Sequence, residues 1–323
     1  MPELQPASSA LQGLTILERG WLSSNNIVIH AVPGEPGAVL VDTGHVAHRG
    51  QTLALVRHAL AQAPHARSLA RIVNTHLHSD HCGGNAVLQQ TFGVPITIPP
   101  GLADAVRAWN LGRLGHDDFG QRERFFIEGT LAAGESFVAG GRRWDALAAP
   151  GHDPQSLMLF DAAAGLLISA DALWENGFGV VFPELVGESG FDEVAATLDL
   201  IERLSAQVVV PGHGAAFTDV AAALARARSR LAAFRADPAR HARHAAKVLL
   251  KYHAMEHRRI ALADLLHWAA AAPLMRGMWQ QFDAGCDAAC GPGPTIEAWI
   301  EGFVRELVGS GALAFEGDQV LDR

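Results

Sequence analysis

Cysteine is scarce in this chain of 323 residues, which contains Cys82, Cys286 and Cys290 and no others. Three cysteines are too few, and an odd number, for a disulfide framework, so a reducing compartment fits the sequence best. The first twenty residues have neither a basic segment nor a long apolar core, and no signal peptide is predicted. No apolar run approaches the roughly 18–20 residues that cross a membrane. We therefore expect a cytoplasmic protein without membrane spans.

A large excess of positive charge is also missing. The formal net charge is -9, from 25 basic and 34 acidic residues. Residues 1–219 carry 12 basic and 23 acidic side chains, a charge of -11, whereas residues 220–323 carry 13 and 11, a charge of +2. A general binder of nucleic-acid phosphates needs a strong positive excess. A small-molecule substrate is therefore the expected partner rather than nucleic acid, and a homo-oligomer is left open.

The apolar pattern predicts a layered α/β domain over residues 1–220. Short apolar strands, such as those over 38–42 and 71–75, alternate with helical segments such as 191–204. Two of the strands resemble each other, because GAVLVDTG (37–44) and GLLISADA (165–172) are both apolar runs that end in an aspartate. This short similarity would suit two related halves that face each other.

From about residue 220 the chain becomes rich in Ala, Arg, His and Leu, and its pattern is helical. The order of helix, short strand (259–262), helix, helix and hairpin (313–323) predicts a smaller C-terminal helical, winged-helix-like domain over 221–323. The histidines of its helices are interpreted as solvent-exposed or packing residues rather than ligands. They are His241, His244, His253, His257 and His267.

The segment NTHLHSDHCGGN (74–85) carries most of the functional information. His76, His78, Asp80 and His81 fall within six residues, directly after a predicted buried strand. Imidazole and carboxylate groups suit zinc and similar divalent metals. In an extended chain, His76 and His78 point the same way because they are two residues apart. The pattern predicts a metal site at the end of this strand.

Three further residues of ligand type also stand at predicted strand ends. His152 lies in the Gly-His turn of APGHDP (149–154), and Asp171 ends the strand GLLISAD (165–171). His213 lies in the Gly-His turn of VVPGHG (209–214). Each is weak alone, but with the first cluster they supply five histidines and two aspartates. Strand ends of an α/β scaffold are a physically reasonable place for such a site.

The ordered set H-x-H-x-D-H, Gly-His, strand-end Asp and Pro-Gly-His-Gly resembles the metallo-β-lactamase superfamily over roughly residues 14–220. The resemblance implies a four-layer αββα sandwich with two divalent metal ions, zinc first and iron or manganese as alternatives. It implies that His76, His78 and His152 bind one metal. It implies that Asp80, His81 and His213 bind the other, and that Asp171 bridges the two. Asp42 matches a strand-end aspartate of the family that orients a ligand histidine.

The metals imply a hydrolytic mechanism. Two divalent cations lower the pKa of a bridging water, and the resulting hydroxide attacks a substrate whose oxygen is polarised by a metal. Asp80 is the predicted catalytic residue, because its carboxylate can orient the nucleophile. Trp174 and Phe178 follow Asp171 closely and are predicted to line the substrate pocket. Cys82 is interpreted as a small packing residue rather than a nucleophile.

The THxHxDHxGGN form resembles the glyoxalase II-like branch, whose members hydrolyse thioesters. After Asp171, however, this chain has ALWENGFG instead of the branch's phenylalanine- and glycine-rich stretch. Lactonases of the superfamily use a tyrosine near the metals, but the one tyrosine here is Tyr252. The helical tail resembles β-lactamase-like endoribonucleases. We expect hydrolysis of an ester, thioester or lactone, with a metal-dependent nuclease as the alternative and a non-catalytic metal-binding or sensor protein as the third.

Overall fold

The computed structural model describes residues 7–114, 122–282 and 293–323. The chain divides into two compact units, one of residues 1–179 and 190–230 (unit 1) and one of residues 180–189 and 231–323 (unit 2). The expected boundary at 220/221 coincides with the start of α8 (Val220–Ala236), and the division between the units falls within that helix. Within the described residues, no helix is both long and apolar enough to span a membrane.

Unit 1 contains a six-stranded sheet, which we call sheet 1. Its strands, in spatial order, are β1 (Leu14–Leu17), β2 (Asn26–Ile29), β3 (Ala38–Val41), β4 (Leu69–Val73), β5 (Ile96–Ile98) and β6 (Gly129–Thr130). The first three strands pair antiparallel, and β3 to β6 pair parallel. The segments between these strands form α2 (Arg49–Ala61), α3 (Ser79–Cys82), α4 (Asn85–Phe92), α5 (Ala103–Ala108) and the short 3-10 helices η1 (Val46–His48) and η2 (Pro100–Leu102).

The second sheet of unit 1, sheet 2, has five strands. Their order is β11 (Val208–Pro211), β10 (Leu166–Ala170), β9 (Leu157–Asp161), β8 (Arg142–Ala148) and β7 (Ser136–Ala139). The pairs from β7 to β10 are antiparallel, whereas β10 and β11 run parallel. The parallel crossover is made by α7 (Phe191–Leu204), and α1 (Ala7–Ala10) precedes β1.

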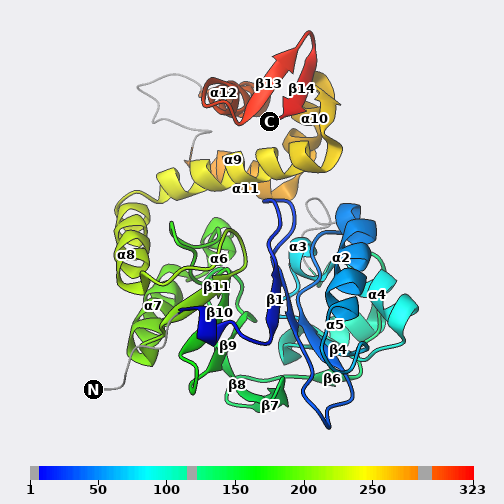
Figure 1. Cartoon of the computed structure of the whole chain (residues 1–323). Helices are drawn as coiled ribbons and strands as arrows, with labels where there is room; N and C mark the ends of the chain where they lie inside the picture. The colour runs from blue at the N-terminus through cyan, green and yellow to red at the C-terminus, as the bar shows by residue number, and fades with distance from the viewer. Residues whose placement is uncertain (1–6, 115–121, 283–292) are drawn as a thin grey trace. The chain divides into compact units, whose positions relative to one another are not determined.

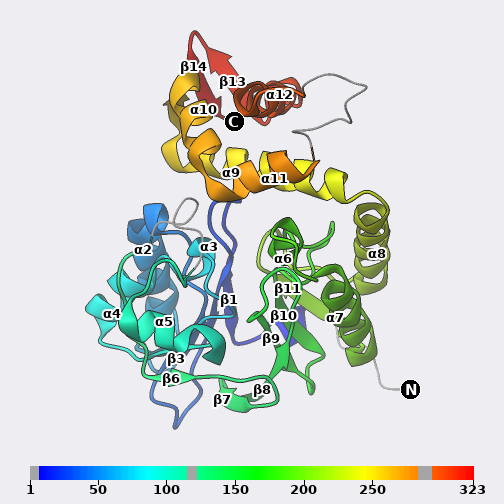
Figure 2. The same ribbon diagram turned by 180° about the vertical axis from the view of Figure 1, so that it is seen from behind.

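The alternation of side chains along the strands explains the layers. Ile27 and Ile29 pack with Trp144 and Leu159 of sheet 2, whereas Val28 packs in a separate cluster with residues of α2, α4 and α5. Neighbouring residues of a strand point to opposite faces, so a sheet with both faces covered needs continuously apolar strands. Figures 1 and 2 show the two sheets face to face, with α2, α4 and α5 outside one and α7 outside the other. The expected αββα sandwich is confirmed.

Unit 2 contains the helices, short strand and hairpin expected of the C-terminal region, together with two further helices, α6 (Phe182–Leu185) and α11 (Pro273–Phe282). The expected elements are α9 (Pro238–His257), β12 (Arg259–Ala261), α10 (Leu262–Ala271), α12 (Ile296–Gly309), β13 (Leu313–Glu316) and β14 (Gln319–Asp322). The hairpin strand β14 pairs antiparallel with both β13 and β12. Thr295 caps α12, as its position predicts, by accepting a hydrogen bond from the Ala298 N–H. The last cysteines, Cys286 and Cys290, lie outside the described residues.

Several elements were not anticipated from the sequence, among them β7 and α11. The strand β7 lies at the edge of sheet 2, and most of its side chains are at least partly exposed, so it lacks a clear apolar signal. The helix α11 begins at Pro273, just after the end of α10, in a stretch to which the sequence pattern assigned no helix. Proline is favoured in the first turn of a helix, which explains the break.

Unit 2 is expected to lose stability as the pH falls, because of His241. This side chain is buried, and its Nε2 accepts a hydrogen bond from the Val181 N–H at 3.2 Å, which requires the neutral ring. Burial, with His244 nearby, lowers the pKa of His241 to about 4. Since the unfolded chain then binds the proton more tightly, stability is present above the unfolded pKa near 6.5 and is lost progressively as the pH falls towards 4.

Urea unfolding at pH 7 and pH 5 tests this expectation. His241 should account for about 1–2 kcal/mol of the stability lost between the two pH values. The variant His241→Gln keeps a side-chain acceptor but does not titrate. The unfolding free energy that it loses between pH 7 and pH 5 should therefore be about 1–2 kcal/mol smaller than that of the wild type. An equal loss in both proteins would show that His241 does not contribute.

Candidate metal centre

Each sheet of unit 1 has a pair of parallel strands, and the residues that follow the carboxyl ends of the two pairs lie close together. In sheet 1, β3 and β4 are parallel neighbours, and in sheet 2, β10 and β11 are. Carboxyl ends of parallel strands lie at one edge of a sheet, which is where polar residues that follow the strands gather. Here Asp42 follows β3, the 74–85 segment follows β4, Asp171 follows β10, and His213 follows β11. The two similar segments, 37–44 and 165–172, therefore contain equivalent strands, β3 in sheet 1 and β10 in sheet 2.

The 74–85 segment turns sharply after β4. His76 and His78 are separated by Leu77, which is buried in the apolar cluster on the helix side of sheet 1. His78 is extended and precedes the single turn of α3, which places Asp80 and His81 side by side. Glycine allows the close packing that follows, since a Cβ at Gly84 would lie 2.4 Å from the carbonyl oxygen of Thr43.

Three histidines form the first group of ligand-type atoms. Nδ1 of His78 lies 3.1 Å from Nε2 of His76 and 2.7 Å from Nε2 of His152. His152 comes from the loop between β8 and β9, so the group joins side chains of both sheets. The ligand atoms of the three residues all lie within 4.8 Å of one another.

Asp80, His81, Asp171 and His213 form the second group, and all four are buried. Oδ2 of Asp80 lies 3.0 Å from Nε2 of His213, although the two residues are 133 positions apart. Oδ1 of Asp171 lies 3.4 Å from Nε2 of His81. A Cβ at Gly212 would lie 2.1 Å from this oxygen, which explains why glycine precedes His213.

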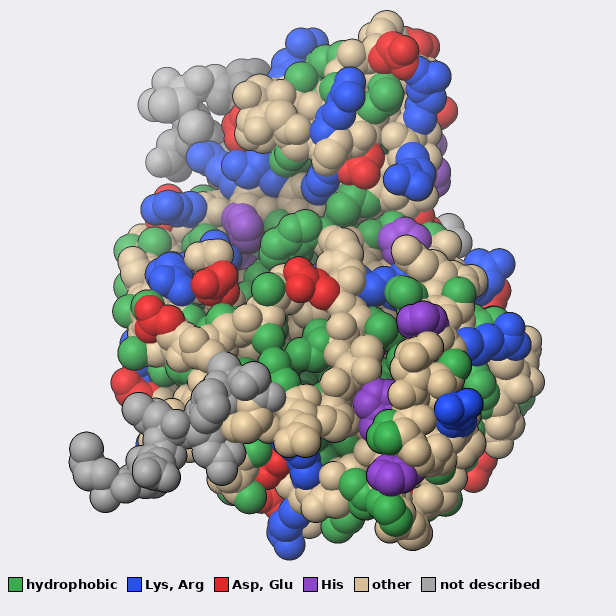
Figure 3. All heavy atoms as spheres, in the orientation of Figure 1, with side chains coloured by type: hydrophobic (Ala, Val, Ile, Leu, Met, Phe, Trp, Pro, Cys, Tyr) green, Lys and Arg blue, Asp and Glu red, His purple; other side chains and the backbone are tan. Residues whose placement is uncertain are grey.

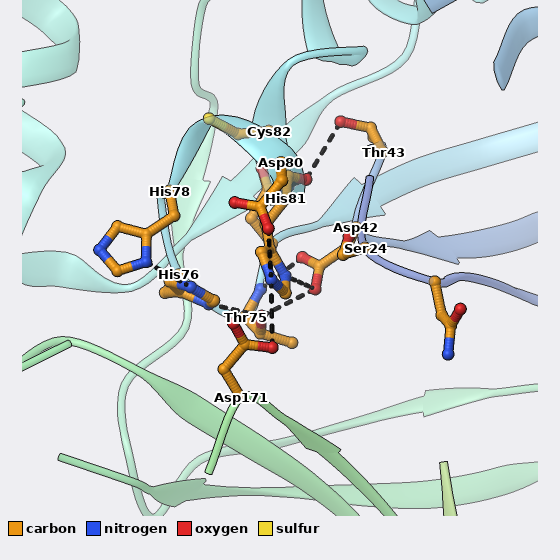
Figure 4. Close-up of polar contacts among 12 residues, drawn as sticks. Ser24, Asp42, Thr43, Thr75, His76, His78, Asp80, His81, Cys82 and Asp171 are labelled. Atoms are coloured by element: carbon orange, nitrogen blue, oxygen red, sulfur yellow. Dashed lines mark hydrogen bonds and ion pairs between the residues drawn. The ribbon is translucent and has the colours of Figure 1, made fainter. Parts of the chain in front are cut away.

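Asp171 lies between the two groups. While its Oδ1 faces His81, its Oδ2 lies 3.4 Å from Nε2 of His152 in the first group. Figure 4 shows the Asp171 side chain pointing from sheet 2 towards the histidines that follow β4. The seven residues predicted as ligands thus form two adjacent groups that share one carboxylate. Their role as metal ligands stays a prediction.

Asp42 contacts the ring nitrogen of His81 that faces away from the other ligand-type residues. Its Oδ2 lies 2.7 Å from Nδ1 of His81, and its carboxylate also accepts hydrogen bonds from the N–H and hydroxyl of Thr75. These contacts orient the imidazole so that Nε2 faces Asp80 and Asp171. The backbone of Asp42 has a positive φ of 56°, a conformation that aspartate tolerates better than most residues.

Two residues near the site were missed by the sequence analysis. Asp153 is buried, and its Oδ2 lies 3.5 Å from Nε2 of His78, on the side opposite the ring nitrogen that faces His76. Trp21 is 58% exposed, yet its ring stacks on His213 at 5.4 Å between centroids. Asp153 directly follows a predicted ligand and could have been considered, whereas nothing in the local sequence marks Trp21.

The predicted pocket residues occupy different positions. The Trp174 indole N–H donates a hydrogen bond to Oδ1 of Asp171 at 3.2 Å, and its ring packs edge-on against His213 and Trp21. Phe178 is buried and lines a small cavity together with His152 and Asp171. Their contact with a substrate stays a prediction.

Cys82 follows His81 but is a packing residue in this structure. Its side chain is buried in the apolar cluster beside sheet 1, and its thiol points to the carbonyl oxygen of Leu77 at 3.6 Å. Burial raises the pKa of the Cys82 thiol, so the thiolate that a nucleophile needs is disfavoured.

The residues present fit divalent cations. Tetrahedral zinc with Zn–N distances of about 2.0–2.1 Å places two ligand nitrogens roughly 3.3 Å apart, close to the 2.7 and 3.1 Å separations among His76, His78 and His152. Nε2 of His81 is buried and forms no hydrogen bond with the described residues. A donor set of imidazoles and carboxylates is one that zinc-class metals accept.

The charge of the second group also favours cations. The carboxylates of Asp42, Asp80 and Asp171 are all buried within 3.8 Å of a His81 ring nitrogen. Burial alone would lower the pKa of His81, but these three carboxylates outweigh it and raise that pKa well above its usual range. Three buried carboxylates so close together are costly unless positive charge lies beside them, because burial removes the water that would solvate them.

The family profile of the metallo-beta-lactamase superfamily matches residues 19–213, more than half of the chain and the whole of the candidate site. The chain belongs to this superfamily. The match begins just after β1 and ends at His213, the last of the predicted ligands. The expected superfamily is therefore confirmed.

Curated relatives agree with this membership. A lactamase-like protein, nscB, of Aspergillus fumigatus is 26% identical over 185 residues, 57% of this chain and 47% of that protein. A hydroxyacylglutathione hydrolase of Rhizobium meliloti is 28% identical over 114 residues, 35% of this chain and 38% of that protein. The chain spans less than half of the length of these relatives.

Solved structures share the fold over nearly the whole chain. A beta-lactamase domain protein from Burkholderia ambifaria has a TM-score of 0.57 and 19% identity, covering 100% of this chain and 97% of that one. A metallo-beta-lactamase family protein from Thermus thermophilus has a TM-score of 0.52 and 20% identity, covering 97% of this chain and 99% of that one. At these identities the likeness concerns the superfamily fold alone.

Proposed function

We propose that this superfamily member is a binuclear metallo-hydrolase that cleaves an ester, thioester or lactone of a small molecule. The observation that carries the proposal is the pair of ligand groups that share Asp171. In this proposal His76, His78 and His152 hold one divalent ion, and Asp80, His81 and His213 hold the other. Zinc is the first expectation, because imidazole is the main donor type.

The chain's own residues would position the reacting groups. Divalent ions supply a lowered pKa for a coordinated water and polarisation of a carbonyl oxygen. Asp80 presents a carboxylate that accepts a hydrogen bond, and its Oδ2 already faces Nε2 of His213 at 3.0 Å. Asp42 holds Nδ1 of His81 and thereby fixes which ring nitrogen faces the site. The low exposure of these side chains excludes bulk water, which strengthens each electrostatic contact.

Aromatic side chains beside His213 support a small organic substrate. Trp21 and Trp174 pack against each other at 5.3 Å between centroids, and both contact the ring of His213. Apolar walls with a few convergent polar groups are typical of small-molecule sites. Figure 3 shows acidic and basic side chains on the same face of the molecule, with basic side chains gathered along α9 in unit 2. A relative named hydroxyacylglutathione hydrolase also supports hydrolysis of an acyl compound.

Metal analysis with a substrate panel tests the proposal. Protein purified without chelator and then dialysed should retain two divalent ions per chain. It should hydrolyse at least one member of a panel of thioesters, lactones and aryl esters, and it should lose this activity when a chelator removes the ions. Addition of zinc, iron(II) or manganese(II) to the stripped protein should restore the activity and identify the effective metal.

Three results would contradict the proposal in different ways. A retained content of one ion, even after reconstitution, would reject the binuclear assignment. Salt-sensitive cleavage of RNA without activity on the small substrates would favour the nuclease. Two bound ions without turnover of any substrate would favour a metal-binding or sensor protein.

A further inference from the structure

The last turn of α9 in unit 2 presents a second cluster of ligand-type side chains. His253, Glu256 and His257 are spaced i, i+3 and i+4, so they share one face of the helix. Each offers a ligand atom, and these atoms all lie within 4.8 Å of one another. None of the three belongs to the candidate metal centre. The sequence alone had suggested solvent-exposed or packing roles for both histidines.

Each histidine is oriented by a contact that leaves a ring nitrogen for a ligand. Nδ1 of His257 donates a hydrogen bond to the carbonyl oxygen of His253 at 3.1 Å, so Nε2 is the ring nitrogen left for a ligand. His253 stacks flat on Trp268 of α10, with 3.5 Å between ring centroids and 7° between planes. Because imidazole binds metals in its own plane, stacking on its face leaves the ligand direction open.

The cluster offers a neutral imidazole, a carboxylate and the C-terminus of a helix to a cation. Burial, with His257 nearby, lowers the pKa of His253 to about 4, so the ring is neutral at pH 7 and its lone pair is available. Glu256 supplies a carboxylate that is partly buried beside the two rings. The helix ends at His257, and the C-terminal end of a helix carries a partial negative charge.

We propose that His253, Glu256 and His257 bind a third divalent ion of the zinc class, at a site in unit 2 separate from the candidate metal centre. Two imidazoles and one carboxylate are a donor set that zinc, nickel(II) and copper(II) accept. Solvent molecules complete the coordination, since His257 is exposed. The proposal does not depend on the hydrolase activity.

Isothermal titration of the metal-loaded protein with Zn²⁺ tests the site. Wild-type protein, first dialysed with its tightly held ions in place, should bind one additional ion per chain. His257→Ala should weaken that binding at least about 10-fold, because it removes a ligand from the exposed surface. His267→Ala is the matched control, since His267 is an exposed histidine of α10 outside the cluster. It should bind as the wild type does.

A second readout uses Trp268. Cu²⁺ bound to the ring stacked on this indole should quench its fluorescence, and Trp268→Phe, which retains an aromatic face, should lose the quenching component but still bind Zn²⁺. The proposal is wrong if wild-type protein takes up no additional ion, or if His257→Ala binds it as tightly as the wild type. If His267→Ala weakened Zn²⁺ binding as much as His257→Ala does, the additional ion would be bound adventitiously at the surface only, and the proposal would also be wrong. None of these outcomes changes the two-ion test of the hydrolase.

Discussion

Asp171→Asn is expected to lower turnover by at least about 100-fold, more than the loss typical of groups that only support a ligand. Asp171 is the carboxylate that both ligand groups share, because its two oxygens each lie 3.4 Å from a ligand histidine, His81 or His152. Asparagine keeps the size but removes one negative charge and places an amide nitrogen where an acceptor is needed. Steady-state kinetics on the best substrate, together with metal content after dialysis, would measure both effects. We expect retained metal to fall below two ions per chain.

Trp174→Phe is the matched control for this prediction. It removes the indole N–H that donates to Oδ1 of Asp171 but keeps the carboxylate and an aromatic ring beside His213. The loss of turnover should be smaller than for Asp171→Asn, and the metal content should stay near two ions per chain. If Asp171→Asn retained both ions and full turnover, the shared-carboxylate assignment would be rejected.

Asp80→Asn is expected to reduce turnover by at least about 10–100-fold. The Asp80 carboxylate faces both His213, at 3.0 Å, and His81, at 3.8 Å, and it is the predicted catalytic group. The change removes the charge that would orient the attacking group while preserving the shape of the side chain. Comparison of kcat with metal content separates the two roles, since a loss of kcat at full metal occupancy indicates a catalytic contribution.

Asp153→Asn provides the comparison for Asp80. Asp153 is also buried, but it contacts the outer nitrogen of His78 at 3.5 Å rather than the space between the two groups. Its replacement should act through metal affinity and have the smaller effect on kcat. Unchanged turnover and metal content in Asp80→Asn would remove Asp80 from the site.

Much of the fold is predictable from this sequence because local signals agree with it. The strands of unit 1 are short apolar runs bounded by Gly, Pro and Asn, and the structure places strands at 38–41, 69–73, 157–161 and 166–170. The half-exposed edge strand β7 was missed, since exposure removes the apolar pattern on which such predictions depend. The helix α11 was missed because it begins at Pro273, and a proline after a helical run is usually a signal that the helix has ended.

What the sequence by itself determined is the donor chemistry of the candidate site. His76, His78, Asp80 and His81 are neighbours along the chain, so their proximity follows from one turn after one strand. The Gly-His turns and the strand-end Asp171 could be recognised as a set by their order and residue types. Asp42 could be placed behind a ligand histidine only through family resemblance.

Only the tertiary structure decided which of these groups meet. Asp80 contacts His213 across 133 positions, and Asp171 joins both groups, because two sheets pack with the carboxyl ends of β3/β4 and β10/β11 at one place. The stacking of Trp21 on His213 and of His253 on Trp268 likewise joins separate segments. Local periodicity specifies which face of an element is apolar, but not the register and packing between elements that set such distances.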